Sequence, residues 1–521
     1  MRISWLAATA TLGLALGIVA CGGSDDDADD PGTGGSTTET GGSGGGNNTN
    51  TGGDNTGGTG GTGGDTGGSG GSPLECEPAH TLCGTECCNN ATEVCNEEDS
   101  CVEGCLIDNT VFLLNTENPV NPCQVCAAAS TTEWTNQPAG TSCHDDGGTV
   151  CNSGECVKPP LISAGGEFTC GATWEGEAMC WGQGDKGQLG NALDSPEPVP
   201  TNVLLTPNNV IAISAGTDHT CAITSAGAAM CWGDNTSRQV GDNSTTYPIY
   251  QPTLVSGLQS NVTAISAGGA HTCAITSAGA AMCWGMRGNG QIGSGNGTGE
   301  PSATPTQVTG LSSGVIAISA GENHTCAITS DKKAACWGLN SFGQIGDNST
   351  ATRYARTSVQ GINSDVIAIS AGESHTCAVT SDGKALCWGR GTEGQLGNGE
   401  DNDSLVPVHV SWPNSESIVD ISAGRWHTCA ITSAGRAMCW GYNSNGQIGD
   451  GTSGADADKK FPTQVQGLES GVFEISAGRL HSCALTSGGG AKCWGDGTNG
   501  GLGNGVLDGD QRTPQDVIDF P

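Results

Sequence analysis

Basic residues are scarce in this chain. Its 521 residues include 18 Lys and Arg against 54 Asp and Glu, which gives a formal net charge of −36. None of the 18 lies between Ile3 and Val157. A surface with this charge repels phosphate backbones. The composition therefore excludes nucleic-acid binding through a basic face and favours a well-solvated acidic surface.

The apolar run at the N-terminus is too short to cross a bilayer comfortably. It follows Arg2 and ends at Ile18-Val19-Ala20-Cys21, which resembles the cleavage motif of bacterial lipoproteins. The resemblance implies removal of residues 1–20 and a lipid on Cys21 as the only link to the membrane. Gly22 stands where an inner-membrane retention signal has Asp, so we expect an outer-membrane or cell-surface protein. The alternative is a plain secretory peptide with an incidental cysteine.

Large apolar side chains are also rare over the next part of the chain. Residues 21–73 are mostly Gly, Thr, Ser, Asn and Asp, which predicts a disordered tether. Residues 74–158 contain twelve cysteines, which predicts a small disulfide-rich module. The first six, from Cys76 to Cys101, follow an order that resembles a cystine knot. Six cysteines allow 15 connectivities, so the pairing stays open. A zinc site at Cys123, Cys126 and His144 is the alternative.

The count of 27 cysteines is odd, and it divides in a way that supports export. Cys21 takes the lipid, twelve cysteines lie between Cys76 and Cys156, and fourteen lie in the repeats described next. Both remaining sets are even, as disulfide bonding in an oxidising compartment requires.

Seven copies of one element fill residues 161–521. Each copy begins with Ile-Ser-Ala-Gly, at intervals of 51 to 54 residues, and continues through a Thr/Ser-Cys pair to Cys-Trp-Gly. Each contains four short β-type runs and no helical periodicity. The pattern predicts an all-β fold, a seven-bladed β-propeller of four-stranded blades. The copies begin at Ile162, Ile213, Ile265, Ile318, Ile369, Ile421 and Ile475.

Two cysteines ten residues apart recur in every copy. If the hairpin turns at Ala226, Cys221 and Cys231 lie directly opposite each other, in a pair whose Cα atoms approach to about 4.5 Å. This distance suits a disulfide, so we expect each blade to be stapled across its own hairpin. Free buried thiols are the alternative. The predicted pairs are Cys170 with Cys180, Cys221 with Cys231, Cys273 with Cys283, Cys326 with Cys336, Cys377 with Cys387, Cys429 with Cys439, and Cys483 with Cys493.

The first copy lacks the Pro-x-x-Val run that precedes the others. The chain ends in Thr513-Pro514-Gln515-Asp516-Val517, which has that pattern. We expect this C-terminal run to complete the first blade and so close the ring.

The repeat pattern AGxxHTxAxTxxGxxxxWGxNxxGQLG resembles that of the regulator of chromosome condensation family, over residues 161–521. The resemblance implies a seven-bladed propeller. The founding member of that family is a nucleotide-exchange factor for a nuclear small GTPase and also binds chromatin. The present chain departs from the family in its paired cysteines, export signal and acidic charge.

The loops at one end of the predicted ring vary most among the copies, so we expect that end to bind a partner. Aromatic, Met and Arg side chains, the usual anchors of protein interfaces, gather there on the third to seventh copies. A scatter of unrelated surface side chains is the alternative. The candidates, centred on Arg390, Arg425, Trp426 and Tyr442, are these four with Met286, Arg287, Phe342 and Arg479.

Six histidines recur at equivalent positions, beginning with His219, and the first copy has Phe168 instead. Catalysis needs one asymmetric site, so this repetition predicts a structural role. No paired carboxylates, nucleophile motif or metal triad stands out, and we expect no cofactor and no metal. The leading hypothesis is a monomeric, surface-anchored, non-catalytic scaffold for a protein or glycan partner. The alternatives are a propeller-based enzyme acting on polysaccharides and a guanine-nucleotide exchange factor.

Overall fold

The computed structural model describes residues 159–521 except 414, 489 and 521, together with nine short strands within residues 80–157. The predicted signal peptide, Cys21 and the tether lie outside the described residues. So does the cysteine pairing in residues 76–156. The nine strands are β1 (His80–Cys83), β2 (Glu86–Asn89), β3 (Glu93–Cys95), β4 (Cys101–Ile107), β5 (Thr110–Leu113), β6 (Gln124–Val125), β7 (Thr135–Asn136), β8 (Val150–Asn152) and β9 (Glu155–Val157).

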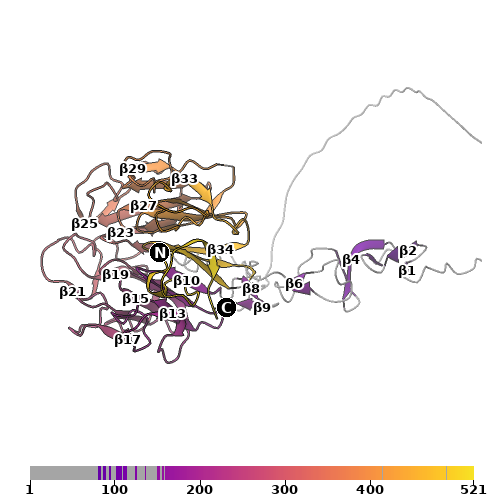
Figure 1. Ribbon diagram of the computed structural model, residues 1–521, viewed down its shortest axis with the longest axis horizontal. Coiled ribbons are helices and arrows are strands. Elements are labelled where there is room, and N and C mark those ends of the chain that lie inside the picture. Colours follow the sequence, from indigo (N-terminus) through magenta and orange to yellow (C-terminus); the bar gives the residue numbers. More distant parts are fainter. Residues whose placement is uncertain are drawn as a thin grey trace, which may run out of the picture.

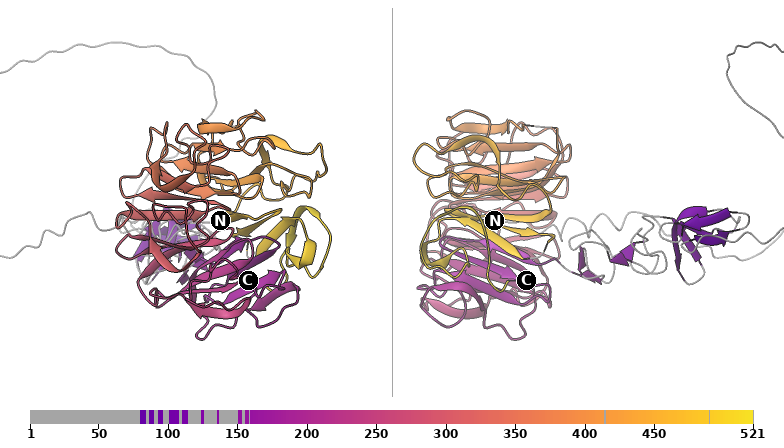
Figure 2. Two further views of the ribbon diagram at one scale, coloured as in Figure 1. Left: turned by 90° about the vertical axis from the view of Figure 1, so that its left-hand side faces the viewer. Right: turned by 45° about the vertical axis from the view of Figure 1, so that its right-hand side comes forward.

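Residues 161–516 form seven four-stranded antiparallel sheets, each built from consecutive strands. We number these blades 1 to 7 in chain order. They stand around one axis, and the sequence colours run once around the ring, so that blade 7 lies beside blade 1 (Figures 1 and 2). The predicted seven-bladed propeller is confirmed.

The innermost strand of each blade carries the Ile-Ser-Ala motif. The end of this strand is buried and contacts the same strand of the neighbouring blades, because its small residues let the seven strands converge. The innermost strands are β10 (Leu161–Ala164), β14 (Val210–Ala215), β18 (Val262–Ala267), β22 (Val315–Ala320), β26 (Val366–Ala371), β30 (Ile418–Ala423) and β34 (Val472–Ala477).

The second and third strands form the cysteine hairpin of each blade. The second strands are β11 (Phe168–Ala172), β15 (His219–Thr224), β19 (His271–Thr276), β23 (His324–Thr329), β27 (His375–Thr380), β31 (His427–Thr432) and β35 (His481–Thr486). The third strands are β12 (Ala178–Gly182), β16 (Ala229–Gly233), β20 (Ala281–Gly285), β24 (Ala334–Gly338), β28 (Ala385–Gly389), β32 (Ala437–Gly441) and β36 (Ala491–Gly495).

The outermost strand of each blade is exposed along one edge. A longer loop joins it to the third strand, and in blade 7 this loop holds a short 3-10 helix, η1 (Thr498–Gly500). The outer strands are β13 (Glu197–Asn202), β17 (Ile249–Leu254), β21 (Ser302–Gln307), β25 (Arg353–Ser358), β29 (Ser404–His409), β33 (Lys459–Gln464) and β37 (Gln511–Asp516).

The register of the hairpin is the predicted one. Cys221 lies opposite Cys231, and the turn between the strands places Gly227 at φ +76°, a left-handed conformation that glycine adopts at little cost.

A disulfide crosses the hairpin of every blade, each with a Cα–Cα distance of 4.1 Å, and all fourteen cysteines are fully buried. Each blade is therefore stapled within itself, and the alternative of free thiols is wrong for these positions. The bonds join Cys170 with Cys180, Cys221 with Cys231, Cys273 with Cys283, Cys326 with Cys336, Cys377 with Cys387, Cys429 with Cys439, and Cys483 with Cys493.

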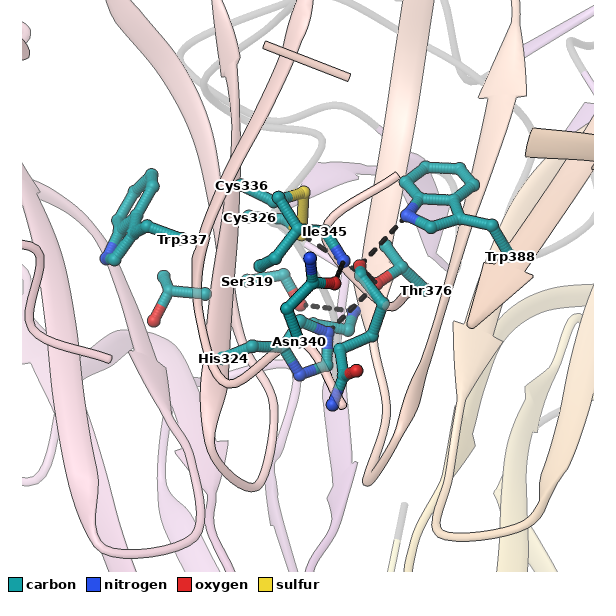
Figure 3. The surroundings of a disulfide bond; sticks show 12 residues. Ser319, His324, Cys326, Cys336, Trp337, Asn340, Ile345, Thr376 and Trp388 are labelled. Atoms are coloured by element: carbon teal, nitrogen blue, oxygen red, sulfur yellow. Dashed lines mark hydrogen bonds between the residues drawn. A yellow bond between two sulfur atoms is a disulfide. The ribbon is translucent and has the colours of Figure 1, made fainter. Parts of the chain in front are cut away.

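The same hydrogen bonds recur between neighbouring blades. From blade 4 to blade 5, the Ser319 hydroxyl accepts from the Ala371 N–H at 2.9 Å, and His324 Nε2 lies 2.9 Å from Thr376 Oγ1 (Figure 3). Trp388 Nε1 donates to a backbone carbonyl of blade 4 at 2.9 Å. These bonds are buried, so each blade is held to the next by polar contacts as well as by packing.

The prediction for the C-terminal strand is wrong. The run Thr513–Asp516 belongs to β37, which pairs with β36 as the outer strand of blade 7 and not with blade 1. In each blade the outer strand pairs with the hairpin that precedes it in the chain, as Thr201 pairs with Cys180. Within the described residues, no strand is exchanged between blades 7 and 1.

The ring closes instead through packing and hydrogen bonds between blades 7 and 1, among them a backbone bond from the Arg479 N–H to the Gly165 carbonyl at 2.9 Å. Phe520 packs against Trp181 of blade 1 with ring centroids 5.4 Å apart, in a cluster shared by blades 7 and 1. His481 Nε2 lies 2.9 Å from Thr169 Oγ1, which repeats the bond found between other blades.

We predict that Phe520→Ala lowers the free energy of unfolding by about 3 kcal/mol, because it empties a buried position at the closing interface. Phe461→Ala is the matched control, since this ring on β33 is 53% exposed and its loss is expected to cost about 0.5 kcal/mol or less. Chemical denaturation followed by tryptophan fluorescence measures both. Equal effects of the two substitutions would contradict a closing role for Phe520.

Candidate functional site

The loops lie at two ends of the propeller. The turns between the innermost and second strands share one end with the loops between the third and outer strands, because neighbouring strands are antiparallel. We call this end the loop face. It is the end at which the sequence places all the candidate binding residues.

Five of the candidates form a continuous stack on the loop face of blades 4 to 6. The Arg390 guanidinium lies between two rings, 5.7 Å from the centre of Phe342 and 5.7 Å from that of Trp426. The Trp426 ring also packs edge-on against Tyr442, with centroids 5.2 Å apart. Arg425 covers the Trp426 ring at 4.0 Å. We call these five residues the aromatic–arginine cluster.

A carboxylate that the sequence analysis did not select holds this cluster in place. Glu373, on the turn of blade 5, accepts hydrogen bonds from Arg425 Nε and, at 3.2 Å, from Trp426 Nε1. Arg390 in turn is paired with Glu393 at 3.0 Å. The cluster is therefore preorganised, and its two cations are each matched by a carboxylate. The only sequence signal for Glu373 is its place in the same turn slot as Arg425, one blade earlier.

The other three candidates lie outside the stack, although Arg479 lines the central cavity beside it. Met286 and Arg287 are on blade 3, where Arg287 Nη2 donates to Ser294 Oγ at 3.2 Å. Arg479 pairs with Glu167 at 3.3 Å across the junction of blades 7 and 1. All three are half-buried, and none takes part in the stack.

The cluster borders a cavity of about 300 Å³ at the centre of the loop face. The turns of all seven blades line it, and both Arg425 and Glu373 belong to its wall. Glu322 also lines it and accepts from Thr217 Oγ1 at 2.9 Å. Burial raises the pKa of the Glu322 carboxyl, and the nearby charges of Glu373 and Asp218 raise it further. The centre of the loop face is thus a cavity with charged side chains in its wall, next to the aromatic–arginine cluster.

The six histidines are structural. In the pair of blades 2 and 3, Thr272 Oγ1 donates to the Gln239 carbonyl at 2.8 Å, so it accepts from His219 Nε2 at 2.9 Å. His219 therefore carries a proton on Nε2, and its buried Nδ1 has no hydrogen-bond partner among the described residues, as suits a neutral ring. Burial lowers the pKa of each of the six to about 3 or 4. Their repetition around the ring provides no single reactive centre.

Two further features are absent from the described part of the chain. Within it, no three His, Cys, Asp or Glu side chains are grouped so that they could hold a metal ion. Nor does it contain a helix long and apolar enough to span a membrane.

Seven four-stranded blades around a central cavity define a β-propeller. In this propeller the variable loops converge at one end, the loop face. The sequence model of the RCC1-like domain matches residues 137–472, and that of the regulator of chromosome condensation (RCC1) repeat matches residues 474–500. The chain belongs to the RCC1-like propeller family.

Individual relatives agree with this membership. The ultraviolet-B receptor UVR8 of Arabidopsis thaliana is 31% identical over 364 residues, which cover 67% of this chain and 81% of the receptor. Yeast RCC1 (Prp20) bound to Kap60 has a TM-score of 0.59 at 19% identity, covering 70% of this chain and 85% of that one. Prp20p from Saccharomyces cerevisiae, described with its binding to Gsp1p and histones, has a TM-score of 0.58 at 20% identity, covering 66% and 86%. Both structures share the fold of this chain.

Proposed function

We propose that this chain is a non-catalytic scaffold that binds a protein partner through the aromatic–arginine cluster and the adjoining rim of the central cavity. The observation that carries the proposal is the stack itself. It places two aromatic rings and two guanidinium groups on neighbouring loops, with a third ring beside them. Trp, Tyr and Arg dominate the residues whose loss weakens protein interfaces most.

The relatives support a protein partner over a glycan. Yeast RCC1 is bound to Kap60 in one structure and is described with its binding to Gsp1p and histones in another, and all of these are proteins. The charges of the cluster are internally paired, so its surface is amphipathic and not strongly basic. Such a surface suits the mixed polar and aromatic character of protein interfaces.

We further propose that the scaffold acts outside the cytoplasm, tethered through Cys21. Seven disulfides within one propeller fit an oxidising compartment, where such bonds persist. The parity of the cysteines and the N-terminal motif point the same way.

The test replaces Trp426 and Tyr442 by alanine together. Loss of two central anchors is expected to weaken partner binding by about 100-fold or more. The partner is captured by cross-linking to the full chain at the cell surface, then purified and titrated against wild type and variant. Tyr247→Ala is the matched control, because Tyr247 is 49% exposed on a loop of blade 2, away from the cluster.

Unchanged affinity of a folded double variant would remove the cluster from the proposal. Turnover of a polysaccharide by the wild type would favour the enzyme alternative. Accelerated nucleotide release from a small GTPase would favour exchange activity.

A further inference from the structure

The outer edges of the blades are blocked by proline in six cases out of seven. In each of these blades the fourth residue of the outer strand is proline, directly before the residue that pairs with the third-strand cysteine. A proline at an edge removes an N–H that another strand would use. The six are Pro200, Pro252, Pro305, Pro407, Pro462 and Pro514.

Blade 4 is the exception, because Arg356 stands at this position in β25. The disulfide of blade 4 shows which way the backbone N–H and C=O groups of β25 point. Cys326 and Cys336 have Cα atoms 4.1 Å apart, the close spacing of a pair that does not exchange backbone hydrogen bonds. The N–H and C=O of Cys336 therefore point toward β25, where its partner is Thr357.

The backbone N–H and C=O groups of successive residues in a strand point to opposite edges. Those of Thr357 therefore point toward β24, and those of Arg356 and Ser358 point away from the blade. Backbone hydrogen bonds to other segments flank these outward-pointing groups on both sides. The carbonyl of Tyr354 accepts from Gly295 of blade 3 at 2.8 Å, and the Gln360 N–H donates to Gly346 at 2.9 Å. Between these two bonds, β25 presents a short free edge.

The surroundings of this edge are basic, although the chain as a whole is strongly acidic. Lys332 and Lys333 form the hairpin turn of blade 4, and neither they nor Arg356 form an ion pair with another described residue. The Thr329 hydroxyl, with Arg356 and Lys333 near it, lowers the pKa of Asp331. Two of these cations, Arg356 and Lys333, thus lie near one carboxylate.

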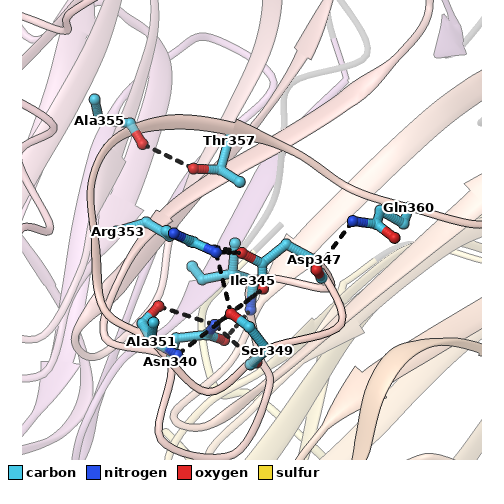
Figure 4. A network of polar contacts seen from close by, with 9 residues as sticks. All are labelled: Asn340, Ile345, Asp347, Ser349, Ala351, Arg353, Ala355, Thr357 and Gln360. Atoms are coloured by element: carbon cyan, nitrogen blue, oxygen red, sulfur yellow. Dashed lines mark hydrogen bonds and ion pairs between the residues drawn. The ribbon is translucent and has the colours of Figure 1, made fainter.

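The remaining arginine of this strand is already engaged. Arg353 Nε donates to Asp347 Oδ2 at 2.6 Å, and Asn340 and Ser349 complete the network (Figure 4). Within the strand, the Thr357 hydroxyl donates to the Ala355 carbonyl at 3.2 Å (Figure 4). The side chains of Arg353 and Thr357 are therefore already engaged within blade 4.

We propose that β25 binds an extended acidic segment of a partner protein, which adds to blade 4 as a short fifth strand. The N–H and C=O of Arg356 and Ser358 supply the backbone pairing, and Arg356 with Lys333 selects for Glu and Asp. This mode of recognition takes affinity from main-chain bonds and specificity from alternate side chains. The site lies on the outer rim of the propeller and is independent of the aromatic–arginine cluster.

The probe is a fluorescent, acetylated hexapeptide of alternating Glu and Val, titrated against the full oxidised chain by anisotropy at low salt. Arg356→Pro is expected to weaken binding at least about tenfold, because it gives blade 4 the block found in the other six. Arg356→Thr keeps the N–H and is expected to have an intermediate effect. Pro407→Thr, which unblocks the edge of blade 5, is expected to leave the affinity at β25 unchanged.

A second probe separates strand pairing from simple charge attraction. The same hexapeptide with every backbone nitrogen methylated keeps its charges but loses the donors on both edges, so it is expected to bind at least about tenfold more weakly to the wild type. Equal binding of the two peptides would overturn the proposal without reference to any variant. So would wild-type affinity of a folded Arg356→Pro chain, or no saturable binding below about 1 mM peptide.

Discussion

Loss of all seven blade disulfides is expected to leave the propeller unfolded at room temperature. Each disulfide joins cysteines ten residues apart and therefore closes a small loop, which contributes roughly 2–3 kcal/mol in the loop-entropy model. The seven loops share no residues, so their contributions add to about 15–20 kcal/mol. That sum exceeds the 5–15 kcal/mol or so by which folded proteins are usually stable.

Refolding with and without reductant measures this effect. The full chain is unfolded in guanidinium chloride with dithiothreitol and diluted into buffer that contains dithiothreitol. The control is unfolded and diluted without reductant. The fluorescence of the seven buried tryptophans of the Cys-Trp-Gly motifs is expected to return only in the control. Native protein in dithiothreitol alone is expected to stay oxidised, because its blade cysteines are fully buried.

A single blade provides a graded version of the same experiment. Cys326→Ala combined with Cys336→Ala removes one staple and leaves no unpaired thiol, so the free energy of unfolding is expected to fall by roughly 2–3 kcal/mol. Recovery of native fluorescence by the fully reduced chain would contradict the dominant role given to the disulfides.

Acidification from pH 7 to pH 5 is expected to lower the free energy of unfolding by on the order of 10 kcal/mol. The cause is the set of six buried histidines, whose pKa values fall to about 3 or 4 in the folded chain. In the unfolded chain each pKa is about 6.5. Between these values the unfolded state binds protons that the folded state does not, so stability falls as the pH falls below about 6.5. Each histidine accounts for about 2 kcal/mol of the loss at pH 5.

Denaturation midpoints in guanidinium chloride at pH 7 and pH 5, with the disulfides intact, measure the loss. His324→Phe is the matched variant, because blade 1 has Phe168 at the equivalent position. It is expected to reduce the difference between the two pH values by about 2 kcal/mol, whatever its effect at pH 7. Equal midpoints at pH 7 and pH 5 in the wild type would show that the histidines are protonated in the folded ring.

The fold could be predicted from the sequence because the repeated motifs show directly how many blades there are and how long each one is. The ten-residue cysteine spacing determined the register of every hairpin, and Gly227 marked its turn. The pairing of the outer strands could not be predicted in the same way. A Pro-x-x-Val run lies between two blades in the sequence, and its pattern suits the edge of either. Only the pairing of residues such as Thr201 with Cys180 shows that it belongs to the earlier blade.

The candidate site was predictable in part. Comparison of equivalent slots identified Arg390, Arg425 and Trp426 because these side chains are unusual among the copies. Their assembly into one stack depends on contacts between blades, which no single repeat contains. Glu373 was missed for this reason, since a carboxylate in a turn resembles ordinary surface until its two donors from the next blade are seen. Arg356 differs from Glu373, because the sequence alone shows that it replaces a proline present in the other six blades. Only the structure shows that its backbone N–H points outward from the blade.

The assignment of every outer strand to its own blade has a consequence for biogenesis. Each blade is made from one continuous stretch of chain, and the thiols that it must join lie ten residues apart in the same hairpin. If the chain is exported as proposed, a blade can oxidise and pair its four strands before the following repeat has crossed the membrane. Only the last event, in which Phe520 seats against Trp181, has to wait for the end of translocation.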